Sequence, residues 1–319
     1  MLGDFFFIKS PHKRTHTHTA KMRLLLLFAL CFARSIFTQD FSNNDEYQFG
    51  RAIKCKRDDG ISQRCMPVFE NVAYNRAISA NNTCGLQKPE EYCVQTGTSG
   101  ASKICNTCYQ KIAGQNHPPD LMTDIKIIGN PTWWQSQSLL DNRYGVHLIL
   151  DFKKKYNIAF VRIRFHTIRP HSFAIYKKST YDSKEEWLPY QYYSATCNAT
   201  YNILDNSLVS LNNQKIALCT SKASGMIPLS GGNVAYLTLD HRPGKNDFDK
   251  YPELQDWVTV TQLKISLDQL NTFGDEVFGD PKVLKSYYFA ISDIAVGGLC
   301  FASFYFVFYN LRFVYSNTK

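Results

Sequence analysis

The chain has 319 residues, 44% of them apolar and 14% aromatic, which is enough to bury a full core in one large domain or two small ones. Its formal net charge is +9 at pH 7, but the basic residues are spread along the chain, so the charge does not indicate a nucleic-acid-binding protein. A mild basic excess would allow weak attraction to acidic matrix polysaccharide. Few helix signals appear, and frequent aromatic, Val, Ile and Thr residues between turn-forming residues favour an all-β domain.

The N-terminal part of the chain, residues 1–38, has the pattern of a leader with a secretory signal peptide. Lys21 and Arg23 precede an apolar run over residues 24–33, as a charged segment precedes the hydrophobic core of a signal. The run is about half as long as a membrane-spanning helix, so we expect cleavage between about Ala33 and Gln39 instead of a membrane anchor. Met22 is therefore a candidate initiator, and the sequence predicts secretion into an oxidising compartment.

Cysteine residues are dense near the start of the expected mature chain, among turn-forming residues. This density predicts an irregular flap that disulfides hold together, instead of regular strand pairing. The last two of these cysteines form a lone CxxC, with neither the βαβ setting of a redox motif nor the second pair of a zinc site, so they too are predicted to be structural. The cysteines of the flap are Cys55, Cys65, Cys84, Cys93, Cys105 and Cys108.

Strand signals follow in the middle of the chain, where residues 146–152, 161–165, 173–176 and 187–193 are alternating or aromatic. We interpret His147, the arginines and the tyrosines of these segments as an ordinary solvent-facing surface.

Two features predict surface loops in this part of the chain and before it. Cys197 and Cys219 bracket a polar stretch, which predicts a loop closed by a disulfide between them. Asn81 and Asn198 begin glycosylation sequons, which predicts that both lie in surface loops.

The segment over residues 254–300 alternates like a sheet but changes phase twice. The first change falls between Val260 and Leu263, where a β-bulge would explain it. The second falls at Ser292 and Asp293, and it predicts a point where the ladder is interrupted and backbone carbonyls are able to face another group.

No catalytic set stands out in the sequence. Ser230 lacks the GxSxG context of a nucleophile elbow, no HExxH motif occurs, and the acidic pairs are short runs typical of a solvated surface. The sequence therefore predicts a protein that is not an enzyme.

Several ordered blocks of the chain closely resemble the laminin N-terminal domain. They are RCMPVFENVAYN (64–75), NTCG (82–85), EEYCVQTG (90–97), PLSGGNVAY (228–236) and NTFGDEVFGDPKVLKSYYFAISDIAVGGLC (271–300). The residues of these blocks resemble laminin gamma chains more than the related netrins. Netrins place a cysteine at the positions of both Trp133 and His166, whereas laminin gamma chains resemble this sequence in having Trp and His there.

The resemblance implies a jelly-roll β-sandwich of the galactose-binding-like kind with a disulfide-rich N-terminal flap. The laminin N-terminal domain would span residues 39–300, and an atypical tail, 301–319, would replace the EGF-like modules that follow in the family. Cys31 falls in the predicted signal, which leaves an odd number of cysteines. We expect Cys300 to be unpaired, because its partner in the family lies in the absent module.

The resemblance also implies a function and a location. The chain is expected to be a secreted glycoprotein of the basement membrane and extracellular matrix, without a membrane span. It would associate with laminin alpha and beta N-terminal domains in network assembly and cell adhesion. The alternative is a netrin-like guidance cue or a carbohydrate-binding module, because a jelly-roll fold does not by itself decide function.

A calcium site is the one bound ion that the resemblance implies. The family pattern places its ligands at the carbonyl of Leu121, the side chains of Asp124 and Thr132, and a group of Ser292. An all-oxygen set suits a hard cation, and the interrupted ladder at Ser292 agrees with such a site. The stretch Ile125-Lys126-Ile127 departs from the family pattern, in which polar residues usually follow the aspartate, and the Lys126 charge in particular argues against a cation there.

Overall fold

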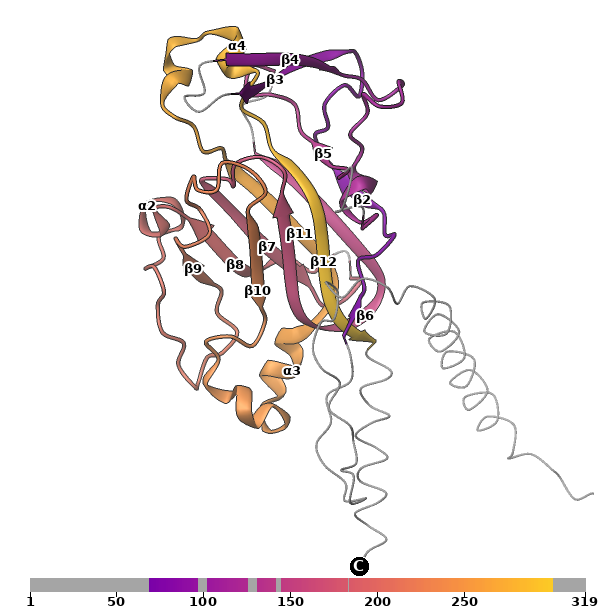
Figure 1. Cartoon of the computed structure of the whole chain (residues 1–319). Helices are drawn as coiled ribbons and strands as arrows, with labels where there is room; N and C mark the ends of the chain where they lie inside the picture. Colours follow the sequence, from indigo (N-terminus) through magenta and orange to yellow (C-terminus); the bar gives the residue numbers. More distant parts are fainter. Residues whose placement is uncertain (1–68, 97–101, 126–130, 142–144, 183, 301–319) are drawn as a thin grey trace, which may run out of the picture. The chain divides into compact units, whose positions relative to one another are not determined.

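A computed structural model describes residues 69–96, 102–125, 131–141, 145–182 and 184–300 (Figure 1). The predicted leader, the predicted tail, Cys55, Cys65 and Lys126 lie outside the described residues. The strands are β1 (Glu70–Asn71), β2 (Ile78–Ala80), β3 (Glu90–Thr96), β4 (Ser102–Cys108), β5 (Trp134–Gln135), β6 (Val146–Phe165), β7 (Ser172–Lys178), β8 (Leu188–Ser194), β9 (Leu218–Thr220), β10 (Asn233–Leu237), β11 (Thr259–Gln269) and β12 (Ala290–Cys300).

The helical segments of the described part are short. None of them is long and apolar enough to cross a membrane. They are the α-helices α2 (Cys197–Tyr201), α3 (Pro252–Val258) and α4 (Pro281–Leu284), and the 3-10 helices η2 (Pro119–Met122), η3 (Pro243–Lys250) and η4 (Asp275–Phe278).

The long strand β6 organises the sheet. Its first half pairs with β2 and β11, and its second half pairs with β10 and β12. Between the halves the pairing of β6 with β11 shifts register, so that Tyr156 faces Val260 while Asp151 faces Gln262. Lys153 lies in the extra stretch with φ 59, and its backbone N–H donates to the Asp151 carboxylate at 2.8 Å. The extra residues act as a bulge that turns the strand from one layer into the other.

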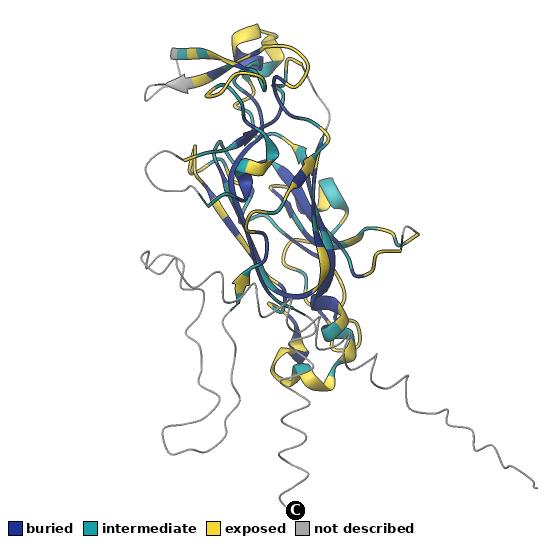
Figure 2. Ribbon diagram, turned by 90° about the vertical axis from the view of Figure 1, so that its right-hand side faces the viewer, coloured by how far each residue is buried: buried dark blue, intermediate teal, exposed yellow. Residues whose placement is uncertain are grey.

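The strands therefore form two layers that share β6. One layer runs β2, β6, β11, β7, β8 and β9, and the other contains β10, β6 and β12 with the short strands β1 and β5 beside β12. Aromatic rings meet between the layers: Phe165 of β6 packs edge-on against Phe173 of β7, and Tyr190 of β8 against Tyr236 of β10. Buried residues follow the strands and exposed ones gather on the connections (Figure 2). This arrangement is the predicted all-β jelly-roll sandwich.

Both predicted changes of phase are confirmed as irregularities of the ladder. The first is the register shift between Val260 and Gln262, and the second is a shift between Ile291 and Asp293 where β12 pairs with β6. The segment before the first shift was predicted as strand. Thr259 and Val260 are strand, but residues 254–258 belong to the helix α3. Pro252 at its first position and Glu253 in its first turn favour a helix start there.

The predicted flap is more regular than expected. Strands β3 and β4 form a two-stranded antiparallel hairpin in which Cys93 lies directly opposite Cys105 and is joined to it by a disulfide. A second disulfide joins Cys84 to Cys108. The prediction of disulfides is confirmed for this region, but the expected absence of regular pairing was wrong, because cross-strand cysteines are compatible with a ladder.

The hairpin is attached to the segment that contains α4. The backbone N–H of Cys93 donates to the carbonyl of Lys285 at 3.0 Å, and the Lys285 ammonium lies 2.6 Å from the carboxylate of Glu91. Tyr92 packs edge-on against Tyr288 at 5.5 Å between ring centroids.

The sequence pattern predicted that the strand tyrosines face solvent, and this prediction was wrong for two of them. Tyr190 and Tyr193 of β8 are fully or almost fully buried, with Tyr193 stacked on Phe173 at 4.4 Å. These two side chains are buried because β8 lies between β7 and β9 and its inward residues meet the opposite layer.

Candidate functional site

The fold brings together the segments that carry the predicted calcium ligands. Leu121 lies in η2, which contacts β12, and Ser292 lies on β12. Asp124 follows η2, and the hydroxyl of Thr132 donates to both oxygens of its carboxylate, at 3.0 and 2.8 Å. The two side chains are therefore direct neighbours, as a shared site requires.

Ser292 sits at the second register shift of β12. Its hydroxyl donates to the carbonyl of Arg164 at 3.2 Å. The next residue, Asp293, is 1% exposed and pairs with the Arg162 guanidinium at 2.8 Å. Burial raises the pKa of Asp293, and the nearby charge of Asp124 acts in the same direction. A second carboxylate, which the prediction of ligands did not include, thus lies within the electrostatic reach of Asp124.

This donor set fits a hard cation in its chemistry. It offers carboxylate, hydroxyl and carbonyl oxygens and no sulfur or imidazole ligand. Within the described ranges, no three His, Cys, Asp or Glu residues gather as a metal-binding group. Carbonyl and hydroxyl oxygens would therefore have to supply part of any coordination shell there.

A stack of rings lies beside this region. Trp133 is sandwiched between His117, at 4.3 Å between centroids, and His166, at 4.1 Å and nearly parallel. Tyr92 of the hairpin packs edge-on against His117 at 6.1 Å. The structure thus places Trp133 and His166, the two residues on which the predicted distinction from netrins rests, face to face.

The stack predicts a specific loss of stability in acid. Burial lowers the pKa of His117 to about 4 and also lowers the pKa of His166, so the folded state keeps both rings neutral. An unfolded chain protonates these histidines below about pH 6.5, so the unfolded state binds more protons and the free energy of unfolding falls between about pH 6.5 and 4. Denaturant titrations across this range should show the decline.

Two variants test whether the fall of stability in acid comes from the histidines of this stack. His117→Phe keeps a stacking ring but does not titrate, so it should flatten the slope of stability against pH. His241→Asn, at a side chain that is 70% exposed, should leave the slope unchanged. Equal slopes in the wild type and His117→Phe would contradict the assignment to this stack.

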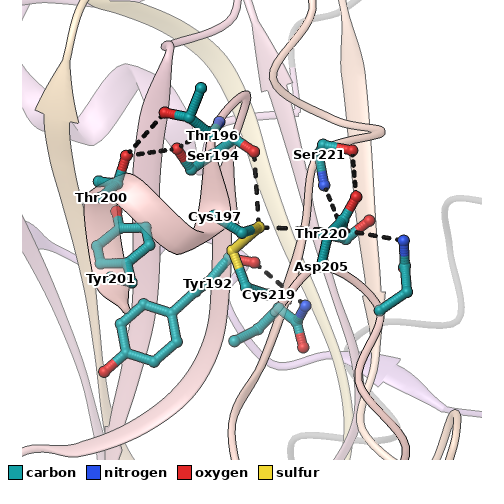
Figure 3. The surroundings of a disulfide bond; sticks show 12 residues. Tyr192, Ser194, Thr196, Cys197, Thr200, Tyr201, Asp205, Cys219, Thr220 and Ser221 are labelled. Atoms are coloured by element: carbon teal, nitrogen blue, oxygen red, sulfur yellow. Dashed lines mark hydrogen bonds between the residues drawn. A yellow bond between two sulfur atoms is a disulfide. The ribbon is translucent and has the colours of Figure 1, made fainter. Parts of the chain in front are cut away.

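A disulfide joins Cys197 to Cys219 across the polar loop that these residues bracket (Figure 3). The loop is also held by Asp205, whose carboxylate accepts hydrogen bonds from the backbone N–H and the hydroxyl of Ser221, at 3.1 and 2.7 Å. Cys300 ends β12 and is partly exposed.

Both sequon asparagines are exposed. The side-chain oxygen of Asn81 accepts from the backbone N–H of His147 at 2.8 Å, and Thr83 of the same sequon is buried and accepts from the Trp134 indole. Asn198 is at the surface as predicted but lies in the short helix α2 instead of a loop, and the hydroxyl of Thr200 is 2.8 Å from that of Ser194.

The most apolar exposed segment near α4 is the loop around η4, which we call the apolar loop (residues 273–278). Phe273, Val277 and Phe278 are 51%, 75% and 84% exposed. The loop is nevertheless fixed, because the Tyr287 hydroxyl accepts from the backbone N–H of Phe273 at 3.0 Å and donates to Asp275. Exposed apolar side chains that lie close in sequence on a fixed support are compatible with an interaction surface.

Comparison with known proteins gives the chain a clear relationship. The family model described as Laminin N-terminal (Domain VI) matches residues 65–298. Among solved structures, chitosan-binding module 1 from a Paenibacillus sp. IK-5 chitosanase/glucanase is similar at 11% identity and a TM-score of 0.35, over 72% of this chain and 99% of that chain. So weak a structural likeness supports no conclusion about ligands.

Curated relatives are much more similar. Laminin subunit gamma-1 of Danio rerio is 49% identical over 79% of this chain and 16% of its own length, and that of Homo sapiens is 48% identical over 77% and 15%. Laminin-like protein lam-2 of Caenorhabditis elegans is 44% identical over 75% and 15%. The chain thus spans only about a sixth of the length of these relatives. Taken together, the match over most of the described domain and these identities show that the chain belongs to the laminin N-terminal (domain VI) family.

Proposed function

We propose that the chain is an extracellular matrix protein whose laminin gamma-type N-terminal domain takes part in the assembly of laminin networks in basement membranes. Its partners would be the N-terminal domains of laminin alpha and beta chains. The observation that carries this proposal is the identity of 48–49% with laminin subunit gamma-1 across 77–79% of this chain.

The apolar loop is the surface that we assign to this assembly. It presents three exposed apolar side chains, and the acidic residues Asp275, Glu276 and Asp280 lie beside them. The complementary partner surface would be apolar at its centre and basic at its rim, since charge complementarity favours the correct encounter. A second laminin N-terminal domain with such a patch is the occupant that we propose.

The alternative function, a netrin-like guidance cue or carbohydrate-binding module, has less support. The stacked Trp133 and His166 occupy the positions where netrins have cysteines, and the curated relatives named above are laminin chains.

The assembly test uses the full chain mixed with alpha and beta laminin N-terminal fragments, followed by light scattering or sedimentation. We expect a complex with the wild type, and about tenfold or greater weakening by Phe278→Ser, because truncation of a hot-spot anchor costs about 2 kcal/mol or more and tenfold corresponds to about 1.4 kcal/mol. Leu208→Ser is the matched control, since Leu208 is 98% exposed and outside the apolar loop.

Two results would contradict the proposal. The first is a folded wild-type chain that forms no complex at any soluble concentration. The second is a complex with a netrin receptor in the same assay without any complex with laminin fragments. If Phe278→Ser and Leu208→Ser weaken the complex equally, the apolar loop is not the assembly surface.

We also propose that calcium binds at Asp124, Thr132, the carbonyl of Leu121 and Ser292. The close Asp124 and Thr132 side chains and the second carboxylate at Asp293 support this assignment. The ion would tie the segment after η2 to β12.

Calcium should raise the thermal midpoint of the wild type, and a chelator should reverse the rise, because a ligand of the folded state stabilises it. Asp124→Ala should remove the response without unfolding the sandwich. Asp240→Ala, at an exposed aspartate far along the sequence, is the control that should keep the response. A calcium response that persists in Asp124→Ala would move the site elsewhere.

A further inference from the structure

Beside α3 the interior of the sandwich contains an unusual cluster of polar and aromatic groups. The cluster consists of Lys177 of β7, Tyr190 of β8, Tyr236 of β10, Arg242 before η3 and Trp257 of α3. Their exposed fractions are 1%, 0%, 6%, 2% and 2% in that order. Two cationic side chains are therefore buried in one place.

Lys177 and Arg242 differ in whether their N–H donors have hydrogen-bond partners. The Lys177 ammonium donates to the carbonyls of Asp256, Trp257 and Thr259, at 2.7, 2.6 and 3.1 Å. All three of its donor positions are thereby satisfied. The guanidinium of Arg242 instead lies over the ring of Trp257, at 4.5 Å to the centroid, and its Nε and Nη1 have no hydrogen-bond partner.

The hydroxyls of both tyrosines are also buried without a hydrogen-bond partner. The rings of Tyr190 and Tyr236 are in contact at 5.0 Å between centroids, and Tyr190 packs against Trp257 at 4.7 Å. Burial raises the pKa of each hydroxyl, and the charge of Arg242 acts in the opposite direction on both. Arg242 is thus an electrostatic neighbour of both hydroxyls. Its side chain and that of Trp257 also lie close enough to the Tyr236 hydroxyl to lower the pKa of that group, although neither makes a hydrogen bond of acceptable geometry with it.

Four buried donors without hydrogen-bond partners, together with a net positive charge, destabilise the folded state. Each buried donor without a partner costs about 1–3 kcal/mol, and a buried charge without a counter-ion costs more. Over the part of the chain that the structure describes, no carboxylate forms an ion pair with Arg242. A species that accepts hydrogen bonds and carries negative charge would remove both costs.

We propose that Arg242, Tyr190 and Tyr236 bind a small monovalent anion, with chloride as the expected species, inside the sandwich beside α3. The rings of Tyr190, Tyr236 and Trp257 pack against one another around these donors, so the site that we propose is one for a small anion and not for phosphate or a carboxylate ligand. Trp257 supplies an aromatic wall. Lys177 offers no free donor, and because burial lowers its pKa to about 7, Arg242 is the cation that the proposed anion pairs with. The anion would tie β8 and β10 to the start of η3.

The test measures the thermal midpoint of the full-length chain while chloride replaces gluconate at a constant ionic strength of about 0.15 M. Gluconate is too large for the site. We expect a saturable rise of about 2–6 °C with chloride in the wild type, as for a ligand that binds only the folded state. Arg242→Met, which keeps the contact with Trp257 but removes the charge, should abolish the rise.

Tyr236→Phe is the milder variant, and it keeps the test decisive if Arg242→Met does not fold. It should shift the chloride response to at least about threefold higher concentration, since one donor is lost. Tyr288→Phe, at a buried tyrosine of the segment between α4 and β12, should respond like the wild type. Crystals grown in bromide should show an anomalous peak within hydrogen-bonding distance of Arg242.

Two outcomes would overturn the proposal. Equal midpoints in chloride and gluconate would show that the donors bind water only. A chloride response unchanged by Tyr236→Phe, without a bromide peak beside Arg242, would place the anion elsewhere on the protein. Both outcomes are independent of whether the chain assembles with other laminin domains.

Discussion

Replacing Gly85 by alanine should lower the free energy of unfolding by about 3–5 kcal/mol, which is a large part of the stability of a domain. Gly85 has φ +65, where a side chain is strained, and an added Cβ would lie 2.4 Å from the carbonyl oxygen of Cys108. The neighbouring backbone cannot easily yield, because the Cys84–Cys108 disulfide holds it and the Gly85 carbonyl accepts from the N–H of Gln110 at 3.0 Å.

Chemical denaturation of the purified chain measures this loss, and the secreted yield gives a second readout if the variant is too unstable to purify. Gly114→Ala is the matched control. Gly114 also has a positive φ, +84, but nothing lies within 4 Å of its added Cβ. Its variant should lose only the backbone term of about 1–2 kcal/mol. Equal losses at both positions would show that the contact with Cys108 is unimportant.

Lys177→Met should be the second severe variant, with a loss of about 2–4 kcal/mol. The methionine fills a similar space, but the carbonyls of Asp256, Trp257 and Thr259 would lose their common donor in the interior. These carbonyls lie at the end of α3, where a helix leaves acceptors without internal partners. The buried lysine therefore caps α3 and fastens it to β7.

The neighbouring lysine provides the control for this prediction. Lys178 is on the other side of β7, where its ammonium lies 5.2 Å from the ring centroid of Trp187. Lys178→Met should cost less than about 1 kcal/mol, as for an exposed cation over a ring. Thermal or urea unfolding of both variants gives the comparison, and a loss below about 1 kcal/mol in Lys177→Met would refute the capping role.

Much of the fold could be predicted because apolar alternation records which face of a strand is buried. The two phase changes in the last part of the chain marked real interruptions of pairing, at Val260 and at Ser292. The ordered blocks of laminin-like sequence identified the family, and the prediction that the chain is not an enzyme agrees with the structural, non-enzymatic character of that family.

Other features could not be predicted because they depend on pairing between distant segments. Lys177 and Arg242 are charged residues, a class that usually lies at the surface, and only the positions of α3 and β10 bury them. Asp293 lies near Asp124 because η2 packs against β12, which no local pattern records. The burial of Tyr190 could not be predicted for the same reason, since its ring meets Tyr236 of the other layer.

The strand β6 has a further consequence for how the chain folds. Neither layer can complete its hydrogen bonds without β6, so the two layers cannot fold as independent units. Its second half pairs with β12, as in the contact of Arg162 with Asp293 across 131 positions of sequence. Closing so long a loop costs entropy before any contact repays it, which makes folding slow. During synthesis the sandwich must therefore remain incomplete, with apolar strand faces exposed to chaperones, until β12 has left the ribosome.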